Sequence, residues 1–188
     1  MAGDPTLRSL RDRPFELLKE LDRRARAAAQ GQPEAAAGGN EWVGIAFRLG
    51  GEAFLLAREE TREVMSYPGS VTRVPGARAW VRGLANVRGQ LLPVIDLRAF
   101  LGSGSTTVGR TTRVLIANHR EIPAGLVVDE VMGFRRFYES EFSADLPPTL
   151  LRCERYLAGA FKRGAEVWPV FSVRTLLESP QFLQAAAS

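Results

Sequence analysis

Two stretches of the chain repeat each other at a constant offset of 76 residues, and this repeat limits the possible folds more than any other feature. When 80–101 is aligned without gaps against 156–177, five positions are identical and most apolar positions between them agree. The identical pairs are Gly83 and Gly159, Pro93 and Pro169, Val94 and Val170, Arg98 and Arg174, and Leu101 and Leu177. The repeat predicts two similar small β-barrels. Because neither buries much surface alone, we expect them to pack together and to form a groove between them.

Each copy of the repeat contains a glycine-bearing strand, a turn, a proline-containing strand and a short helix. Proline has no backbone N–H to donate to a neighbouring strand. We therefore expect the strands that contain Pro93 and Pro169 to be edge strands or to carry a bulge.

The chain from Trp42 onwards consists mainly of short alternating apolar segments, separated by glycine, proline or polar turns. Gly50 and Gly51 predict a hairpin turn. Strands are predicted at 42–49, 52–57, 70–74, 79–87, 90–95, 112–118, 124–128, 131–137, 155–161 and 166–172. Short helices are predicted at 97–101, at 173–179 and within the tail 179–188. Many short strands with few helices indicate an all-β fold, an antiparallel barrel or sandwich.

The N-terminal part has a different pattern. Residues 1–30 predict a helix, with Asp12 as a cap, Pro14 in the first turn and a one-sided apolar stripe. The stripe consists of Leu17, Leu18, Leu21, Ala25 and Ala28. This helix either packs on a barrel edge or binds a partner.

Changes in composition suggest how the chain is divided. We expect an N-terminal helix and linker over 1–40, one domain of two intertwined barrel subdomains over 41–180 and a tail over 181–188. The stretch "GSGSTTVG" indicates a flexible loop, so an internal boundary is expected near 102–110.

The apolar runs, the N-terminal segment and the cysteine count of the chain exclude several classes of protein. No apolar run approaches the ~20 residues that span a bilayer, and the N-terminus lacks the apolar core of a secretory signal. The single cysteine, Cys153, excludes an internal disulfide and fits a reducing cytoplasm. We expect a folded cytoplasmic protein.

The net charge of +4 invites a nucleic-acid hypothesis. However, the arginines alternate with acidic residues, as in "FLLAREETREVM" and "VVDEVMGFRRFYESEF", and form no single basic block. No repeated interleaving of aromatic and basic residues indicates a single-strand binder. A basic β-barrel that binds RNA is kept as the alternative function.

No group of residues predicts catalysis, and no cofactor or metal is expected. The only histidine, His119, lies in a polar turn and has no companion with metal-ligand spacing. Cys153 has no motif around it and is interpreted as an inert thiol. Neighbouring carboxylates on strands point to opposite faces, which makes poor acid–base pairs. A small hydrolase would have to use His119 or Cys153.

The segment "NVRGQLLP" is the best candidate for a functional surface. Gly89 indicates a turn, so that Arg88 projects from a hairpin beside apolar strands. Such a guanidinium either anchors a partner's carboxylate or carbonyl groups or lies across its own barrel. Asn86 is interpreted mainly as a residue that stabilises the turn.

These residues belong to a longer pattern that resembles the CheW-like domain. The pattern "V-x-G-x-x-N-x-R-G-x-x-x-P-V-x-D-L" starts at Val81, and "F-x-L-G" starts at Phe47. The segments "GLVVDEV", "LPP" and "YLAGAF" follow in the order found in that family. The resemblance covers about 42–177, and within the family the chain is most similar to adaptors of type IV pilus (twitching) chemosensory systems.

The resemblance implies a fold of two SH3-like five-stranded barrels packed together. It implies a non-enzymatic adaptor that connects the cytoplasmic tip of a chemoreceptor to the regulatory domain of a CheA-type histidine kinase. It implies no nucleic-acid partner, and contact with the membrane only through the receptor, in receptor arrays.

The resemblance also suggests residues that bind partners. Arg88 matches the functional arginine of the family, and Glu63 matches its interface glutamate. Thr61 stands where an apolar contact residue is common, so the receptor surface is expected to differ there. Ser172 stands where an aspartate is usual, which predicts a different closing turn in the second barrel. With Asn86, the expected partner-binding residues are Arg88, Glu63 and Thr61.

Overall fold

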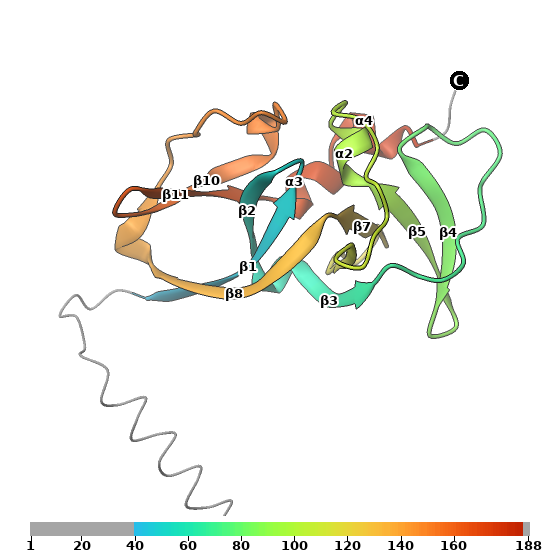
Figure 1. Ribbon diagram of the computed structural model, residues 1–188, viewed down its shortest axis with the longest axis horizontal. Coiled ribbons are helices and arrows are strands. Elements are labelled where there is room, and N and C mark those ends of the chain that lie inside the picture. Colours follow the sequence, from blue (N-terminus) through green and yellow to red (C-terminus); the bar gives the residue numbers. More distant parts are fainter. Residues whose placement is uncertain (1–39, 186–188) are drawn as a thin grey trace, which may run out of the picture. The chain divides into compact units, whose positions relative to one another are not determined.

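The computed structural model describes residues 40–185, so the helix predicted over 1–30 lies outside the described part. The described chain forms two β-sheets with a few short helices (Figure 1). The first sheet, called the six-stranded barrel, has the order β8 (Glu130–Tyr138), β1 (Glu41–Leu49), β2 (Glu52–Ala57), β11 (Glu166–Phe171), β10 (Leu157–Arg163) and β9 (Phe142–Ser143). The second, the five-stranded barrel, has the order β3 (Thr61–Ser66), β6 (Arg113–Ala117), β7 (Gly125–Val128), β5 (Gln90–Asp96) and β4 (Val81–Val87).

The helices are all short. The α-helices are α2 (Leu97–Phe100), α3 (Val173–Leu177) and α4 (Pro180–Leu183), and the 3-10 turns are η2 (Arg58–Glu60), η3 (Glu139–Glu141) and η4 (Glu154–Tyr156). The predicted all-β fold of two packed small barrels and the three predicted helices are confirmed. The sixth strand of the larger sheet, β9, has only two residues.

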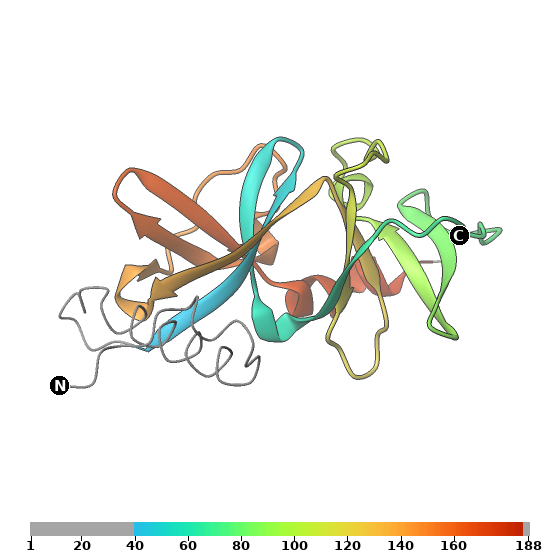
Figure 2. The same cartoon turned by 60° about the horizontal axis from the view of Figure 1, so that its bottom comes forward.

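Each sheet combines strands from both halves of the chain, before and after the loop over 102–112. The β1–β2 hairpin joins β8–β11, and the β6–β7 hairpin joins β3–β5 (Figure 2). The chain therefore changes sheet at η2 and again between β7 and β8. The loop over 102–112 separates the sequence copies, but β5 before it and β6 after it belong to the same sheet. The expected boundary near 102–110 therefore lies between two halves of the chain that are intertwined, since each half contributes a hairpin to the sheet of the other.

The repeat is reproduced in detail by the backbone. Gly83 and Gly159 both have large positive φ angles, 141° and 147°, and each follows a register shift in its strand. A side chain at Gly83 would meet the carbonyl oxygen of Thr72 at 2.1 Å, and one at Gly159 would meet that of Ser143 at 2.5 Å. Both positions therefore require glycine so that a neighbouring segment can approach.

The two prolines do not lie on edge strands, so that part of the expectation is wrong. β5 and β11 are both interior strands of their sheets. Each has a parallel neighbour on one side, and that pairing starts one residue after the proline, at Val94 and at Val170. The missing N–H is tolerated because each proline has only one paired neighbour. The bulges lie on the partner strands, beside Gly83 and Gly159.

The turn that follows the proline-containing strand differs between the two copies, as expected from Ser172 in place of the usual aspartate. Asp96 is fully buried, and its carboxylate caps α2 and accepts hydrogen bonds from Thr106 and Arg82. Ser172 caps α3, and Glu60 from η2 supplies a carboxylate that accepts hydrogen bonds from the Ser172 hydroxyl (3.2 Å) and the Val173 N–H (2.6 Å).

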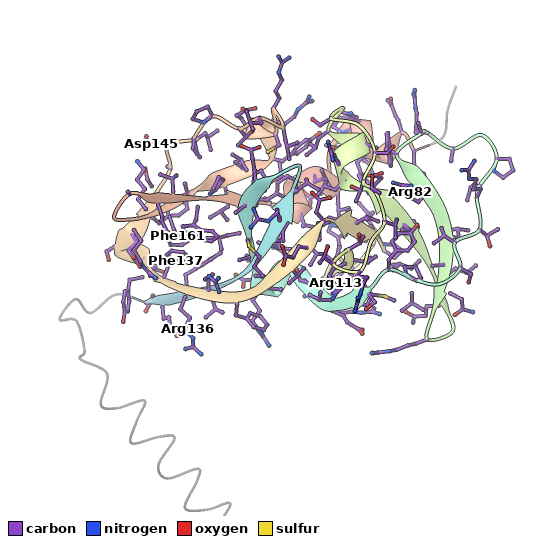
Figure 3. All side chains as sticks on the ribbon, in the orientation of Figure 1. Arg82, Arg113, Arg136, Phe137, Asp145 and Phe161 are labelled. Carbon is purple, nitrogen blue, oxygen red and sulfur yellow. The ribbon has the colours of Figure 1, made fainter. Side chains whose placement is uncertain are left out.

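Apolar residues form three clusters. One lies inside each barrel, and the largest contains residues of both sheets and of the helices. Phe137 and Phe161 stack inside the six-stranded barrel with ring centroids 4.7 Å apart (Figure 3). The five-stranded barrel is filled by smaller residues: Ala85, Val94, Val114 and Val127.

Nine of the ten predicted strands are present within a few residues of their expected limits. The exception is 70–74, which contributes only an isolated bridge from Thr72 to Leu84. The periodicity analysis missed β3 and β9. β3 has the sequence TREVMS and buries none of its residues fully, so it lacked the apolar alternation on which strands were predicted.

Candidate functional site

Two features that lie next to each other form the candidate site: a turn that presents Arg88, and a groove between the barrels. Arg88 and Gly89 form the two-residue turn of the β4–β5 hairpin, closed by the pair Val87 and Gln90. Both turn residues have positive φ, 52° and 82°, which suits the right-handed twist of a hairpin. Asn86 accepts a hydrogen bond from the Gly89 N–H through its side-chain oxygen at 2.9 Å. Asn86 therefore shapes the turn, as the sequence suggested.

The structure brings Arg88 and Glu63 together. An Arg88 Nη2 donates to Glu63 Oε1 at 2.7 Å, although the residues are 25 positions apart in the chain. The Arg88 side chain is 77% exposed and that of Glu63 26%. An ion pair this exposed contributes about 0–1 kcal/mol to stability. Most of the guanidinium therefore remains available to a partner.

Glu63 is directed to this place by an irregularity in β3. The pairing of β3 with β6 shifts between Thr61 and Glu63, so that Arg62 is an extra residue in its strand. A bulge of this kind turns the following side chains. The start of β3 is fixed by Asn118, whose side chain donates to the Glu59 carbonyl at 2.8 Å and whose N–H donates to the Glu60 carbonyl at 2.9 Å.

A groove of about 480 Å³ lies beside the ion pair, and we call it the inter-barrel groove. It is lined by residues of β1 and β8 from one barrel and of η2, β3 and Asn118 from the other side: Ile45, Arg58, Glu59, Thr61, Arg62, Glu63, Val64, Asn118 and Phe134. Two of these, Phe134 at 61% and Val64 at 36%, are exposed apolar side chains. Charged residues surround them, which is a composition typical of a protein-binding surface.

Thr61 lines the same groove. Its hydroxyl is buried and has no hydrogen-bond partner within residues 40–185. A buried hydroxyl without a partner costs about 1–3 kcal/mol. The wall of the groove thus contains a buried hydroxyl whose hydrogen-bonding capacity is not satisfied within residues 40–185. All four expected site residues lie at or beside the groove or the turn, and neither Phe134 nor Val64 was identified from the sequence.

The two residues considered for catalysis are in different surroundings. Cys153 is fully buried, and burial is the main cause that raises the pKa of its thiol. His119 Nδ1 accepts hydrogen bonds from the N–H groups of Ile122 (3.1 Å) and Glu121 (3.3 Å), which is a role in the turn between β6 and β7. Its side chain is only 18% exposed. Within residues 40–185, no group of three His, Cys, Asp or Glu side chains is arranged to hold a metal ion.

None of the helices in the described residues is both long enough and apolar enough to span a membrane.

Comparison with known proteins identifies the family. The profile of the CheW-like domain matches residues 43–181. The chain belongs to the CheW-like domain family. It is 40% identical to Protein PilI of Pseudomonas aeruginosa over 173 residues, which cover 92% of this chain and 96% of that protein. It is 33% identical to Protein FrzA of Myxococcus xanthus over 65% of this chain and 70% of that protein.

A solved structure agrees with the fold. The scaffolding protein TtCheW from Thermoanaerobacter tengcongensis superimposes with a TM-score of 0.66 at 25% identity, covering 76% of this chain and 96% of that one. The resemblance inferred from the "N-x-R-G" and "P-V-x-D-L" segments is therefore confirmed at the level of family and fold.

Proposed function

We propose that this CheW-like protein is a non-enzymatic adaptor that holds a chemoreceptor and a CheA-type histidine kinase together. The pathway we propose is the one that controls type IV pilus twitching motility, because of the similarity to PilI along almost the whole chain. The adaptor would act in the cytoplasm, recruited to receptor arrays at the membrane. The name of one neighbour, a scaffolding protein, supports a role in assembly rather than catalysis.

The inter-barrel groove is the observation that carries this proposal. It is concave, it presents Phe134 and Val64 between charged residues, and it lies beside the Arg88–Glu63 pair. An amphipathic helix binds in such a groove by inserting its apolar face. The helical hairpin at the tip of a chemoreceptor has this form, so we propose the groove as its binding site.

Arg88 supports the proposal by its conformation. Its φ of 52° lies in the left-handed region, which costs a non-glycine residue about 1–2 kcal/mol. The exposed ion pair to Glu63 does not clearly offset that cost. Glycine at this position would serve the fold better, so the arginine is best explained by contact with one of the partners, through its bidentate guanidinium.

A coupling protein needs no chemistry of its own. If the receptor changes conformation, the adaptor transmits the change only to the extent that its contacts differ in free energy between the two states. Two barrels that share a central core give two surfaces at a fixed spacing, which is what such coupling requires.

The proposal is tested with the full chain, a cytoplasmic receptor fragment and the kinase. Phe134→Glu places a charge in the groove, and we expect it to weaken receptor binding by about tenfold or more, since burying an unpaired charge costs several kcal/mol. Leu183→Glu is the matched control, because Leu183 is also 61% exposed but lies on α4, outside the groove. If both variants bind the receptor fragment and activate the kinase as the parent does, the groove is not the receptor site.

A further inference from the structure

The two barrels carry opposite net charges. Residues 61–128, which form the five-stranded barrel, contain nine arginines and three acidic residues, a net charge of +6. The ranges 40–60 and 129–185 contain nine basic and twelve acidic residues, a net charge of −3. No acidic residue occurs between Glu63 and Asp96, a stretch that holds Arg73, Arg78, Arg82 and Arg88.

Three of these arginines meet in one cavity, which we call the arginine pocket. Arg73, Arg78 and Arg82 line a space of about 410 Å³ together with Val74 and Ser105, and none of its lining residues is acidic. Figure 3 shows Arg82 beside α2 and β4, on the opposite side of the molecule from Phe137 and Phe161. The pocket therefore belongs to the five-stranded barrel alone.

The fold holds the pocket in place at three points. Thr72 exchanges two backbone hydrogen bonds of 2.8 Å with Leu84, which fixes the segment that carries Arg73. The Arg78 N–H donates to the Ala185 carbonyl at 2.8 Å, and Arg82 is fixed by the buried carboxylate of Asp96.

These contacts leave two charges uncompensated. Asp96 neutralises Arg82, but Arg73 and Arg78 form no ion pair with any residue of 40–185. Two guanidinium groups at a concave site attract anions, and that attraction is strongest where the wall is partly shielded from water.

We propose that the arginine pocket binds an acidic segment of a partner protein. Carboxylates of that segment pair with Arg73 and Arg78, and an aliphatic side chain beside them contacts Val74, which is 40% exposed. This proposal goes beyond the receptor groove and does not depend on it, since the pocket and the groove share no residue.

A protein fits this surface better than a nucleic acid does. Stacking of bases needs exposed aromatic rings, and the aromatic residues of the five-stranded barrel are covered. Trp80 is 8% exposed, Phe100 is 3% exposed, and Tyr67 packs against the barrel core. All nine basic residues here are arginines, whose planar fork pairs with carboxylates and with phosphates, so the preference for a protein rests on the aromatic residues and on Val74. Val74 adds the apolar contact that a protein partner can use.

The test uses a short fluorescent peptide of glutamates interrupted by leucines, and the same peptide with glutamine for glutamate. Binding to the full chain is measured by fluorescence anisotropy at low and moderate salt. The double variant Arg73→Glu/Arg78→Glu is compared with Arg110→Glu/Arg120→Glu, which has the same net charge and changes exposed arginines of the same barrel outside the pocket. Arg73→Glu alone serves where Arg78 is needed for folding, which thermal unfolding reports.

We expect the glutamate peptide to bind, the glutamine peptide not to bind, and the pocket variant to lose about tenfold in affinity, the effect of one good charged contact. The control variant should lose about twofold or less, through screened long-range charge. Equal losses in both double variants, or no binding of the peptide, would overturn the proposal. Binding of an oligonucleotide or of phosphatidylserine vesicles that depends on Arg73 and Arg78, while the peptide does not bind, would also overturn it. The pocket variants should still bind the receptor fragment, so failure here and failure of the groove are separate results.

Discussion

Arg88 and Glu63 form an ion pair of 2.7 Å across the five-stranded barrel, from the β4–β5 turn to β3. The two residues approach each other because β3 carries a bulge after Thr61 and because both residues of the turn have positive φ. Neither feature favours the stability of a small barrel, because a bulge interrupts strand pairing and a positive φ strains a non-glycine residue. The pair is more easily explained as an arrangement that orients Arg88 for a partner.

Exchange of the two charges distinguishes a role of the pair in partner binding from a role in holding the turn and β3 together. We expect Arg88→Glu and Glu63→Arg each to weaken binding to one partner, and the double variant not to recover it, because we propose that the guanidinium, which is 77% exposed, contacts the partner itself. Pull-down with receptor fragment and kinase measures this, with circular dichroism to check the fold. Full recovery in the double variant would show that the pair only holds the turn and β3 together.

Arg88→Gly tests the strain at the turn. Glycine adopts positive φ without steric cost, so we expect the free energy of unfolding to change by no more than about 1 kcal/mol, or to rise, while partner binding falls. Urea unfolding and pull-down on the same sample measure both quantities. A large loss of stability would mean that the ion pair matters more to the fold than its exposure indicates.

Gly83→Ala and Gly159→Ala should both destabilise the protein, by about 1–3 kcal/mol or more each. Each substitution forces a side chain against a carbonyl oxygen and holds a non-glycine residue at a φ above 140°. Gly51→Ala is the control, since Gly51 also has a positive φ, 90°, but open space around it, and we expect it to cost only the backbone strain of about 1–2 kcal/mol, less than either of the other two. Chemical denaturation gives all three values. A cost at Gly83 similar to that at Gly51 would remove the close approach of Thr72 as the reason for glycine.

Much of the fold follows from local signals in the sequence. Glycine and proline positions marked the turns, and the repeat at an offset of 76 residues correctly indicated two similar barrels. The intertwining of the two halves of the chain was expected, but which hairpins are exchanged did not follow, because alternation of apolar residues shows which face of a strand is buried but not which strand lies beside it. The same limit explains why an edge strand was one of the two positions expected for Pro93 and Pro169.

Less of the site could be derived without the family resemblance. The turn at Arg88 was visible in "VRGQ", but its contact with Glu63 depends on a bulge in a strand that has no apolar alternation. The opposite net charges of the two barrels were also not predicted, because the order of charges along the chain does not show which barrel carries them. Along the chain, acidic and basic residues alternate around 58–63 and 129–141, where the chain changes sheet, while the acid-free stretch from Val64 to Ile95 falls within one barrel.

Cys153 provides a probe of global unfolding. Its thiol is fully buried, and burial chiefly raises its pKa, so both access and thiolate formation are suppressed in the native state. We expect labelling by iodoacetamide to be limited by unfolding and to accelerate in urea along with the loss of structure. Ser140→Cys adds a thiol at an exposed position as a control and should label at once. Rapid labelling of Cys153 in native buffer would mean that the region around η4 opens locally.

Arg163 of β10 and Glu141 of η3 are joined by two hydrogen bonds of 2.6 and 2.7 Å, and this pair makes the stability depend on pH. The hydrogen bond from Arg163 is the main cause that lowers the pKa of Glu141 below its ordinary value of 4.5. A carboxyl group whose pKa is lower in the folded state stabilises the fold above its unfolded pKa and loses that contribution as the pH falls through the folded pKa. Arg163→Gln should therefore be less stable than the parent at neutral pH, and the difference should shrink as the pH falls below about 4.5. Urea unfolding between neutral and acidic pH measures this difference.

Arg155→Gln, which removes an arginine that lies over the Tyr156 ring, should give a difference that does not change over the same range. A difference for Arg163→Gln that stays constant would show that Arg163 acts through its contact with the Phe137 ring, 4.5 Å away, and not through Glu141.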